Sequence, residues 1–161
     1  MPVPPLLADL LRKLCADERA SADDLGALAE VVGDPVLRDA LERHRQTSVE
    51  QAERVESRLA ALGLEPSRAK GLGASIGAAV TGMIELAHGE DPARAARDAY
   101  ARAQRELATY RVLEEVAAAT GDHETASLAR RGAQEERELA DAIDESWARV
   151  ARLTLAARDE G

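Results

Sequence analysis

Apolar residues recur every three or four positions along most of the chain, which is the spacing of amphipathic α-helices packed in a bundle. In the first segment this apolar stripe consists of Leu7, Leu11, Leu14, Leu25, Leu28 and Val32. Glu18 falls on the same stripe. Proline suits the first position of a helix and glycine suits the position after its last turn. The pattern therefore predicts a first helix that begins at Pro5 and ends before Gly33.

A second helix is predicted directly after the first. Asp34 suits the N-cap and Pro35 the first helical position, so one helix stops and the next starts within three residues. Its inner stripe, which is polar in the middle, consists of Leu37, Leu41, His44, Ser48, Gln51, Val55 and Leu62. So short a turn forces the two helices into an antiparallel hairpin, residues 5–62.

The same pattern of helix, Gly-Asp turn and helix returns in residues 92–155, after a crossover at residues 63–91. Within the crossover, the apolar residues from Ile76 to Leu86 predict a short amphipathic helix between the second and third long helices. Gly71-x-Gly73 is a weak phosphate-loop signal without a preceding strand, so these glycines are better interpreted as helix-packing positions. Residues 156–161 are predicted to fray. The sequence thus predicts an all-α chain, residues 1–161, folded as one antiparallel four-helix bundle.

Amino-acid composition indicates which binding partners and which cellular compartment to expect. With only 2% aromatic residues, the chain favours closely packed helices over an aromatic-rich β core. A net charge of -9 argues against nucleic acid and anionic membranes, which attract basic surfaces. Neither a signal peptide nor a membrane span is recognisable, so a cytoplasmic protein is expected. Cys15 is the only cysteine, which excludes an intrachain disulfide.

The two hairpins align at an offset of 88 residues, which places Gly33-Asp34 on Gly121-Asp122. The matched pairs include Glu18 with Glu106 and Thr47 with Glu135. This agreement predicts an internal duplication. Because the helices of a hairpin are antiparallel with the same rise per residue, Glu18, Thr47, Glu106 and Glu135 are expected at one level of the bundle. Carboxylates buried at one level are costly unless they are paired or bind a cation.

These residues resemble an incomplete dimetal site. Carboxylate-bridged dimetal bundles use one Glu from each of two helices and a Glu-x-x-His from each of the other two. The candidate ligands are Glu18, His44, Glu50, Glu106, Glu135 and Glu138. Thr47 is the main defect, because a hydroxyl replaces a carboxylate that would bridge two cations. Oxygen-rich ligands favour iron or manganese over zinc. A buried polar network without metal is the alternative, and a carboxylate-based hydrolase or transferase lacks a recognisable nucleophile.

Across residues 6–155 the chain resembles the YciE/YciF-type ferritin-like proteins, a bacterial family associated with stress responses. The resemblance is carried by Ala16-Asp17-Glu18, by His44, Ser48, Gln51 and Glu53-Arg54-Val55-Glu56, by Glu106 with Tyr110, and by Gly121-Asp122 and Glu135-Glu136. It implies a ferritin-like bundle and extends dimetal chemistry to Glu18, Glu106, Glu135 and Glu136. Thr47 and Ala103 stand where the family pattern has Glu, and Ala140 where it has Asp.

Two functions are therefore expected as alternatives. The first is a ferritin-like protein with a reduced carboxylate site for iron or manganese, acting in iron handling or oxidative-stress protection. The second is a metal-free helical interaction protein. Self-association as a homodimer is expected, and no organic substrate is identifiable.

Overall fold

The computed structural model describes residues 2–31, 34–66 and 92–159. Every regular element in these three ranges is an α-helix. In chain order the helices are α1 (Pro5–Val31), α2 (Pro35–Ala61), α4 (Pro92–Ala119), α5 (His123–Asp144) and α6 (Trp147–Asp159). The all-α bundle predicted from the sequence is confirmed. The predicted crossover helix, the glycines at 71–82 and the predicted helix end at Gly33 lie outside the described residues.

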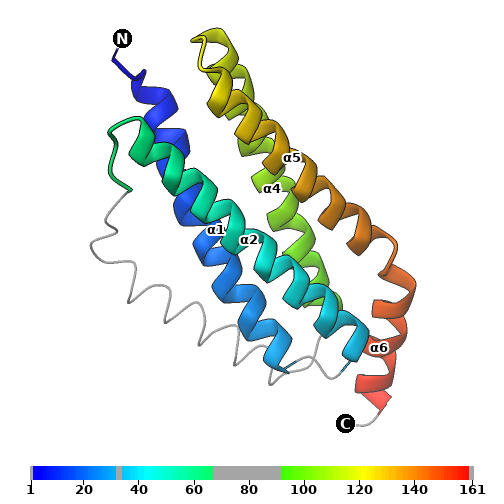
Figure 1. Cartoon of the computed structure of the whole chain (residues 1–161). Helices are drawn as coiled ribbons and strands as arrows, with labels where there is room; N and C mark the ends of the chain where they lie inside the picture. Colours follow the sequence, from blue (N-terminus) through cyan, green and yellow to red (C-terminus); the bar gives the residue numbers. More distant parts are fainter. Residues whose placement is uncertain (1, 32–33, 67–91, 160–161) are drawn as a thin grey trace.

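The helices form two antiparallel hairpins, α1 with α2 and α4 with α5, which pack side by side (Figure 1). Across the two hairpins, α1 contacts α4 and α2 contacts α5. The N-terminus and the α4–α5 turn lie at one end of the bundle, and α6 lies at the other (Figure 1).

One aspartate caps the start of the second helix in each hairpin, as the sequence predicts. The Asp34 carboxylate accepts a hydrogen bond from the Leu37 amide at 2.9 Å, and the Asp122 carboxylate accepts one from the Thr125 amide at 3.0 Å. Each cap satisfies a backbone donor that has no partner within its helix. Gly121 has φ 75°, a left-handed conformation that only glycine adopts without strain. These local interactions set the positions at which α2 and α5 begin.

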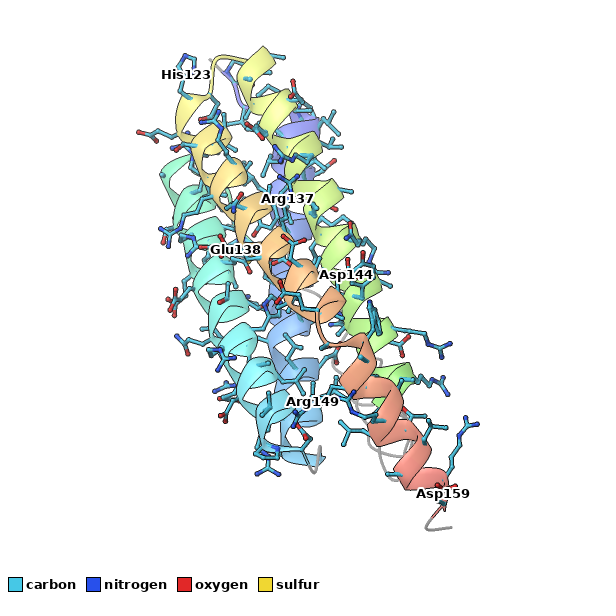
Figure 2. All side chains as sticks on the ribbon, turned by 90° about the vertical axis from the view of Figure 1, so that its right-hand side faces the viewer. His123, Arg137, Glu138, Asp144, Arg149 and Asp159 are labelled. Atoms are coloured by element: carbon cyan, nitrogen blue, oxygen red, sulfur yellow. The ribbon has the colours of Figure 1, made fainter. Side chains whose placement is uncertain are left out.

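The fourth long helix is not continuous, in contrast to the prediction. It breaks at Glu145 and Ser146, after which α6 continues to Asp159 through most of the tail that was predicted to fray. The break turns α6 toward the start of α2, where Arg149 pairs with Asp34. Figure 2 shows α5 and α6 from the outside, with Asp144 near the break and Arg149 beyond it. These contacts come from distant parts of the chain, so the helical periodicity does not reveal them.

Large buried apolar side chains gather in the half of the bundle that contains the α4–α5 turn. This core includes Leu7, Leu11, Leu14, Val55, Leu59, Tyr110 and Leu113. Toward α6 many of the buried positions hold alanine, among them Ala22, Ala29, Ala103 and Ala140. Most of the buried polar residues, among them Glu18, Ser48 and Glu136, lie between these two regions. None of the helices in the described ranges is long and apolar enough to cross a membrane.

Candidate metal centre

Three glutamates from three helices meet inside the bundle. Glu18 on α1, Glu106 on α4 and Glu136 on α5 are 0%, 3% and 0% exposed. One carboxylate oxygen of each lies within 4.8 Å of those of the other two. We call these three residues the glutamate cluster. Such a group has the size and chemistry of a metal-binding site.

Helix register explains why these glutamates meet. Glu18 lies 15 residues before Gly33 and Glu106 lies 15 before Gly121, whereas Glu136 lies 15 after Gly121. Equal distances from the turn put residues of antiparallel helices at the same height. The fourth position of this layer is Ser48, which lies 15 residues after Gly33 and is fully buried. One hydroxyl therefore completes a layer of three carboxyl groups.

Two hydrogen bonds fix the orientation of the cluster. The Tyr110 hydroxyl donates to Glu18 Oε1 at 2.7 Å, and the Gln51 amide donates to Glu136 Oε1 at 2.9 Å. His44 Nε2 lies 4.0 Å from Glu136 Oε2, beyond hydrogen-bond distance. The side chains of Gln51 and His44 thus lie on either side of the layer, one turn from Ser48 in each direction along α2.

Several buried polar atoms around the cluster lack a hydrogen-bond partner. They are Oε2 of Glu18, Glu106 and Glu136, Nε2 of His44, Oε1 of Gln51, and the hydroxyls of Ser21 and Ser48. Leaving even one buried polar group unpaired costs about 1–3 kcal/mol, so the carboxyl groups must either share protons with one another or bind a cation. A cation bound by the three glutamates would satisfy their carboxylate oxygens together.

Burial and mutual repulsion raise the pKa of each carboxyl group in the cluster. Burial, followed by repulsion from Glu18 and Glu136, raises the pKa of Glu106 to about 10. Burial and then repulsion from Glu136 raise the pKa of Glu18 to about 8, against the lowering effect of the Tyr110 hydrogen bond. Burial raises the pKa of Glu136 to about 7, although the Gln51 hydrogen bond lowers it. Without a cation, the cluster thus retains protons at neutral pH.

His44 is held in its neutral form. Burial, and then repulsion from Arg102, lowers the pKa of its imidazole to about 4. The neutral imidazole is the form that binds metals. His44 therefore carries no positive charge beside Glu136 at neutral pH.

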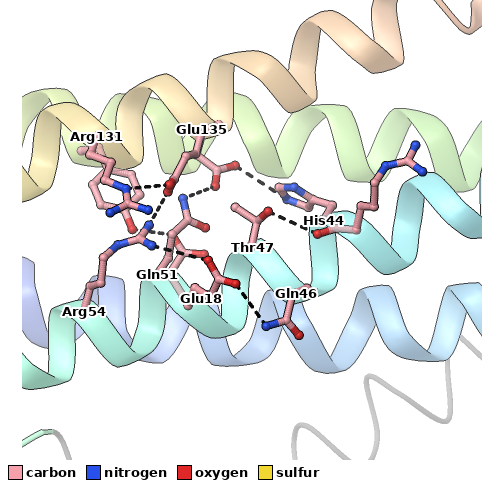
Figure 3. Close-up of polar contacts among 12 residues, drawn as sticks. Glu18, His44, Gln46, Thr47, Gln51, Arg54, Arg131 and Glu135 are labelled. Carbon is pink, nitrogen blue, oxygen red and sulfur yellow. Dashed lines mark hydrogen bonds and ion pairs between the residues drawn. The ribbon is translucent and has the colours of Figure 1, made fainter.

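The structure does not bring all the predicted ligands to this centre. Glu18 and Glu106 lie at it and His44 lies beside it, 4.0 Å from Glu136, whereas Glu136 takes the place expected for Glu135. Glu135 instead pairs with Arg54 and Arg131 beside the layer (Figure 3).

Glu50 and Glu138 lie on exposed surfaces, where they accept hydrogen bonds from Gln46 and Gln134, respectively. A step of one residue turns a side chain by about 100°, which separates Glu135 from Glu136.

The positions that depart from the family pattern add no ligand. Thr47 donates its hydroxyl to the Arg43 carbonyl at 3.2 Å, along its own helix (Figure 3). Ala103 and Ala140 are buried at 0% and 3% exposure. In this chain, apolar methyl groups therefore occupy two buried positions at which the family pattern has carboxylates.

The spacing of the sequence could have identified Glu136 and Ser48, because counting 15 residues on both sides of each glycine selects them directly. The pairing of Tyr110 with Gly132 has no comparable signal. A Cβ atom added at Gly132 would lie 2.4 Å from the Tyr110 ring atoms Cε1 and Cζ. The absence of a side chain at Gly132 thus makes room for the ring that donates to Glu18.

Replacing Gly132 with Ala is expected to destabilise the protein by about 1–3 kcal/mol, because the buried Tyr110 ring must move. Urea denaturation measures this change. Gly26→Ala is the matched control: its Cβ would meet only Arg45 Cδ, at 3.1 Å, at the half-exposed end of a flexible side chain. Alanine is favoured over glycine in a helix by about 0.5–1 kcal/mol, so this control is expected to be neutral or stabilising. Equal effects of the two substitutions would contradict the proposed packing.

The residues present fit a metal ion of the type expected from the sequence. Three carboxylates are ligands suited to iron or manganese, and the unpaired atoms Glu18 Oε2, Glu106 Oε2 and Glu136 Oε2 belong to them. Tyr110 and Gln51 hold two of the carboxylates from outside, as residues around metal ligands commonly do.

Comparison with known proteins places the chain in a family. The family model "Domain of unknown function (DUF892)" matches residues 5–156. No curated protein matches the chain. The crystal structure of a protein from Xanthomonas campestris pv. campestris is similar, with a TM-score of 0.80 and 24% identity, over 96% of this chain and 97% of that one.

A second similar structure is that of the E. coli stress protein YciF, with a TM-score of 0.78 and 18% identity. The match covers 91% of this chain and 95% of YciF. Together with the family match, this similarity confirms the resemblance to the YciE/YciF-type proteins. The chain belongs to the DUF892 family.

Proposed function

We propose that this protein binds iron or manganese at the glutamate cluster and acts in iron handling or oxidative-stress protection. The observation that carries the proposal is the set of unpaired, buried carboxylate oxygens on Glu18, Glu106 and Glu136. A purely structural polar network would pair these atoms with donors, because each unpaired one opposes folding. The name of YciF as a stress protein supports the cellular part of the proposal.

The residues around the cluster would hold such an ion in a defined geometry. Tyr110 and Gln51 each donate to one oxygen of a glutamate and leave its other oxygen free. The apolar core on one side and the alanines on the other limit access of water. A bound iron ion would supply the one-electron chemistry that the side chains lack.

Metal quantification after chelation and reloading tests the proposal. The purified protein, stripped of metal and reloaded with Fe(II) without oxygen, is expected to retain stoichiometric iron after desalting. The double variant Glu18→Gln/Glu106→Gln is expected to lose that iron and to slow Fe(II) oxidation when air is admitted. Glutamine keeps the side-chain volume but removes the charge.

The control variant is Glu50→Gln/Glu138→Gln, which removes the same number of charges at exposed positions. It is expected to retain the iron content and oxidation rate of the wild type. If the wild type retains no iron or manganese, or if both double variants behave alike, the metal function is refuted. The metal-free interaction protein is then the better interpretation.

A further inference from the structure

We propose that cations enter and leave the glutamate cluster between α2 and α5, and that the ion pair of Arg54 with Glu135 is the gate across this route. This inference rests on the proposed metal function and adds how the site is filled. The three glutamates of the cluster are 0%, 3% and 0% exposed. An ion therefore reaches them only when a side chain that covers them moves.

The packing of the helices favours one side of the cluster for such a route. The two helices of each hairpin contact each other more extensively than the hairpins contact one another. Between the hairpins, α2 and α5 contact each other less extensively than α1 and α4 do. On the α1–α4 side, the buried ring of Tyr110 lies against the cluster and its hydroxyl donates to Glu18. The α2–α5 side is thus the less closely packed approach to the cluster.

Polar side chains lie in succession from the surface to the cluster on the α2–α5 side (Figure 3). Arg54 and Glu135 come first, with 23% and 19% of their side chains exposed. Gln51, one turn before Arg54 on α2, is buried and donates to Glu136. The Oε1 atom of Gln51 has no hydrogen-bond partner, and amide oxygens are suitable ligands for a cation. These oxygens would replace part of the water shell that an entering ion loses.

The Arg54–Glu135 ion pair closes this path. Arg54 on α2 binds Glu135 on α5, and Arg131 donates to the same carboxylate at 3.0 Å. Burial and, to a lesser extent, the negative charge of Glu135 raise the pKa of the adjacent Glu136, so Glu135 acts electrostatically on the cluster. The guanidinium of Arg54 both covers this approach and repels a cation. The ion pair must therefore open before a cation passes.

A second ion pair between the hairpins provides a comparison. Arg102 on α4 pairs with Asp24 on α1, and their side chains are 23% and 15% exposed. Asp24 lies six residues beyond Glu18, a distance of about 9 Å along α1. Glu135, by contrast, directly precedes a residue of the cluster. Opening of the Arg102–Asp24 pair is therefore not expected to uncover the cluster.

The kinetics of Mn(II) exchange by the full chain test the gate. In a stopped-flow instrument, metal-free protein is mixed with Mn(II), and loaded protein is mixed with a fluorescent chelator. The double variant Arg54→Gln/Glu135→Gln is expected to speed both uptake and release by about threefold to fivefold, the factor for removing one partly exposed ion pair from a barrier. The amount of Mn(II) bound at saturation should equal that of the wild type, because a gate changes the barrier and not the bound state.

The control is Asp24→Asn/Arg102→Gln, which removes an ion pair of similar exposure and is expected to keep the rates of the wild type. Each double variant loses one positive and one negative charge, so the net charge of the protein stays the same. Equal acceleration in the two double variants, or unchanged exchange rates in Arg54→Gln/Glu135→Gln, would overturn the gate.

The single variant Arg54→Gln provides a second measurement. If Arg54 acted only through its positive charge, its loss would strengthen cation binding and slow release. Loss of a gate instead speeds release, so slower release from this variant would contradict the inference. A wild type that retains neither manganese nor iron would refute the proposed function itself, whereas bound metal with unchanged exchange rates in the variants would refute only the gate.

Discussion

Glu106→Gln is expected to stabilise the metal-free protein by roughly 2–4 kcal/mol at pH 7.5. The pKa of Glu106 is raised from 4.5 to about 10, so this carboxyl group must take up a proton when the chain folds at neutral pH. Each pH unit above 4.5 adds about 1.4 kcal/mol to that cost. Glutamine is neutral at every pH and avoids the cost. The substitution removes a ligand as well, so stability and metal binding should change in opposite directions.

The surroundings of Glu106 can accept the amide that replaces it. Glu18 Oε2 and Glu136 Oε2 are both unpaired acceptors within the same cluster. An amide N–H₂ group that donates to them would satisfy atoms that are otherwise buried without a partner. This local compensation is the reason why a buried substitution is expected to be favourable here.

Urea denaturation of chelator-treated protein at pH 7.5 measures the effect. Glu138→Gln serves as the control, because Glu138 is exposed and its replacement should change stability by no more than about 0.5 kcal/mol. A destabilised metal-free Glu106→Gln variant would show that the ionised carboxylate contributes favourably to the fold. That result would contradict the electrostatic description of the cluster.

The metal-free wild type is expected to lose several kcal/mol of stability between pH 5 and pH 8. Folding raises the pKa of Glu136, Glu18 and Glu106 from 4.5 to about 7, 8 and 10. The folded state therefore binds more protons than the unfolded state above pH 4.5. The stability from these groups is fully present below pH 4.5 and is lost as the pH rises through the folded values.

Other groups that face the cluster also affect how the stability of the protein depends on pH. His44 acts in the opposite sense: its pKa is lowered from 6.5 to about 4, so its contribution is present above pH 6.5 and is lost as the pH falls through 4. Three carboxyl groups outweigh one imidazole between pH 5 and 6.5. The positive charge of Arg102 on α4 lowers the pKa of Glu106 in part. Arg54 on α2 acts on Tyr110, which stays protonated because burial raises its pKa. The stability of the metal-free protein therefore falls as the pH rises over this range.

Thermal unfolding at pH 5, 6, 7 and 8, with and without Mn(II), measures this dependence. Metal binding requires deprotonated carboxylates, so the stabilisation by Mn(II) should grow as the pH rises. The metal-free midpoint should fall over the same range. A metal-free midpoint that rises from pH 5 to pH 8 would contradict the raised pKa values.

The sequence was sufficient to predict the hairpins because their signals are local. Asp34-Pro35 and Asp122 begin helices through contacts with residues three positions away, and Gly121 ends one through its own backbone. Burial of Glu18 and Glu106 was also predictable, since both fall on apolar stripes. These predictions needed only periodicity and capping chemistry.

The features that the sequence did not predict depend on contacts between residues that are distant along the chain. Glu135 and Glu136 are adjacent, and only the Arg54 pairing on one and the Gln51 bond on the other distinguish their roles. The break before α6 accompanies the pairing of Arg149 with Asp34, across most of the chain. Likewise, nothing local to Gly132 indicates that the Tyr110 ring covers it.

The distribution of the ligands over the two hairpins has a consequence for how they stay together. Glu18 belongs to the first hairpin, and Glu106 and Glu136 belong to the second. A bound cation would thus act as a reversible crosslink between the hairpins, in a chain whose lone Cys15 can form no internal disulfide. The stabilisation by this crosslink would increase with the free metal concentration. It would add about 2.7 kcal/mol to the free energy of unfolding when that concentration is one hundred times the dissociation constant. The stability of the bundle would then depend on how much metal the surrounding solution contains.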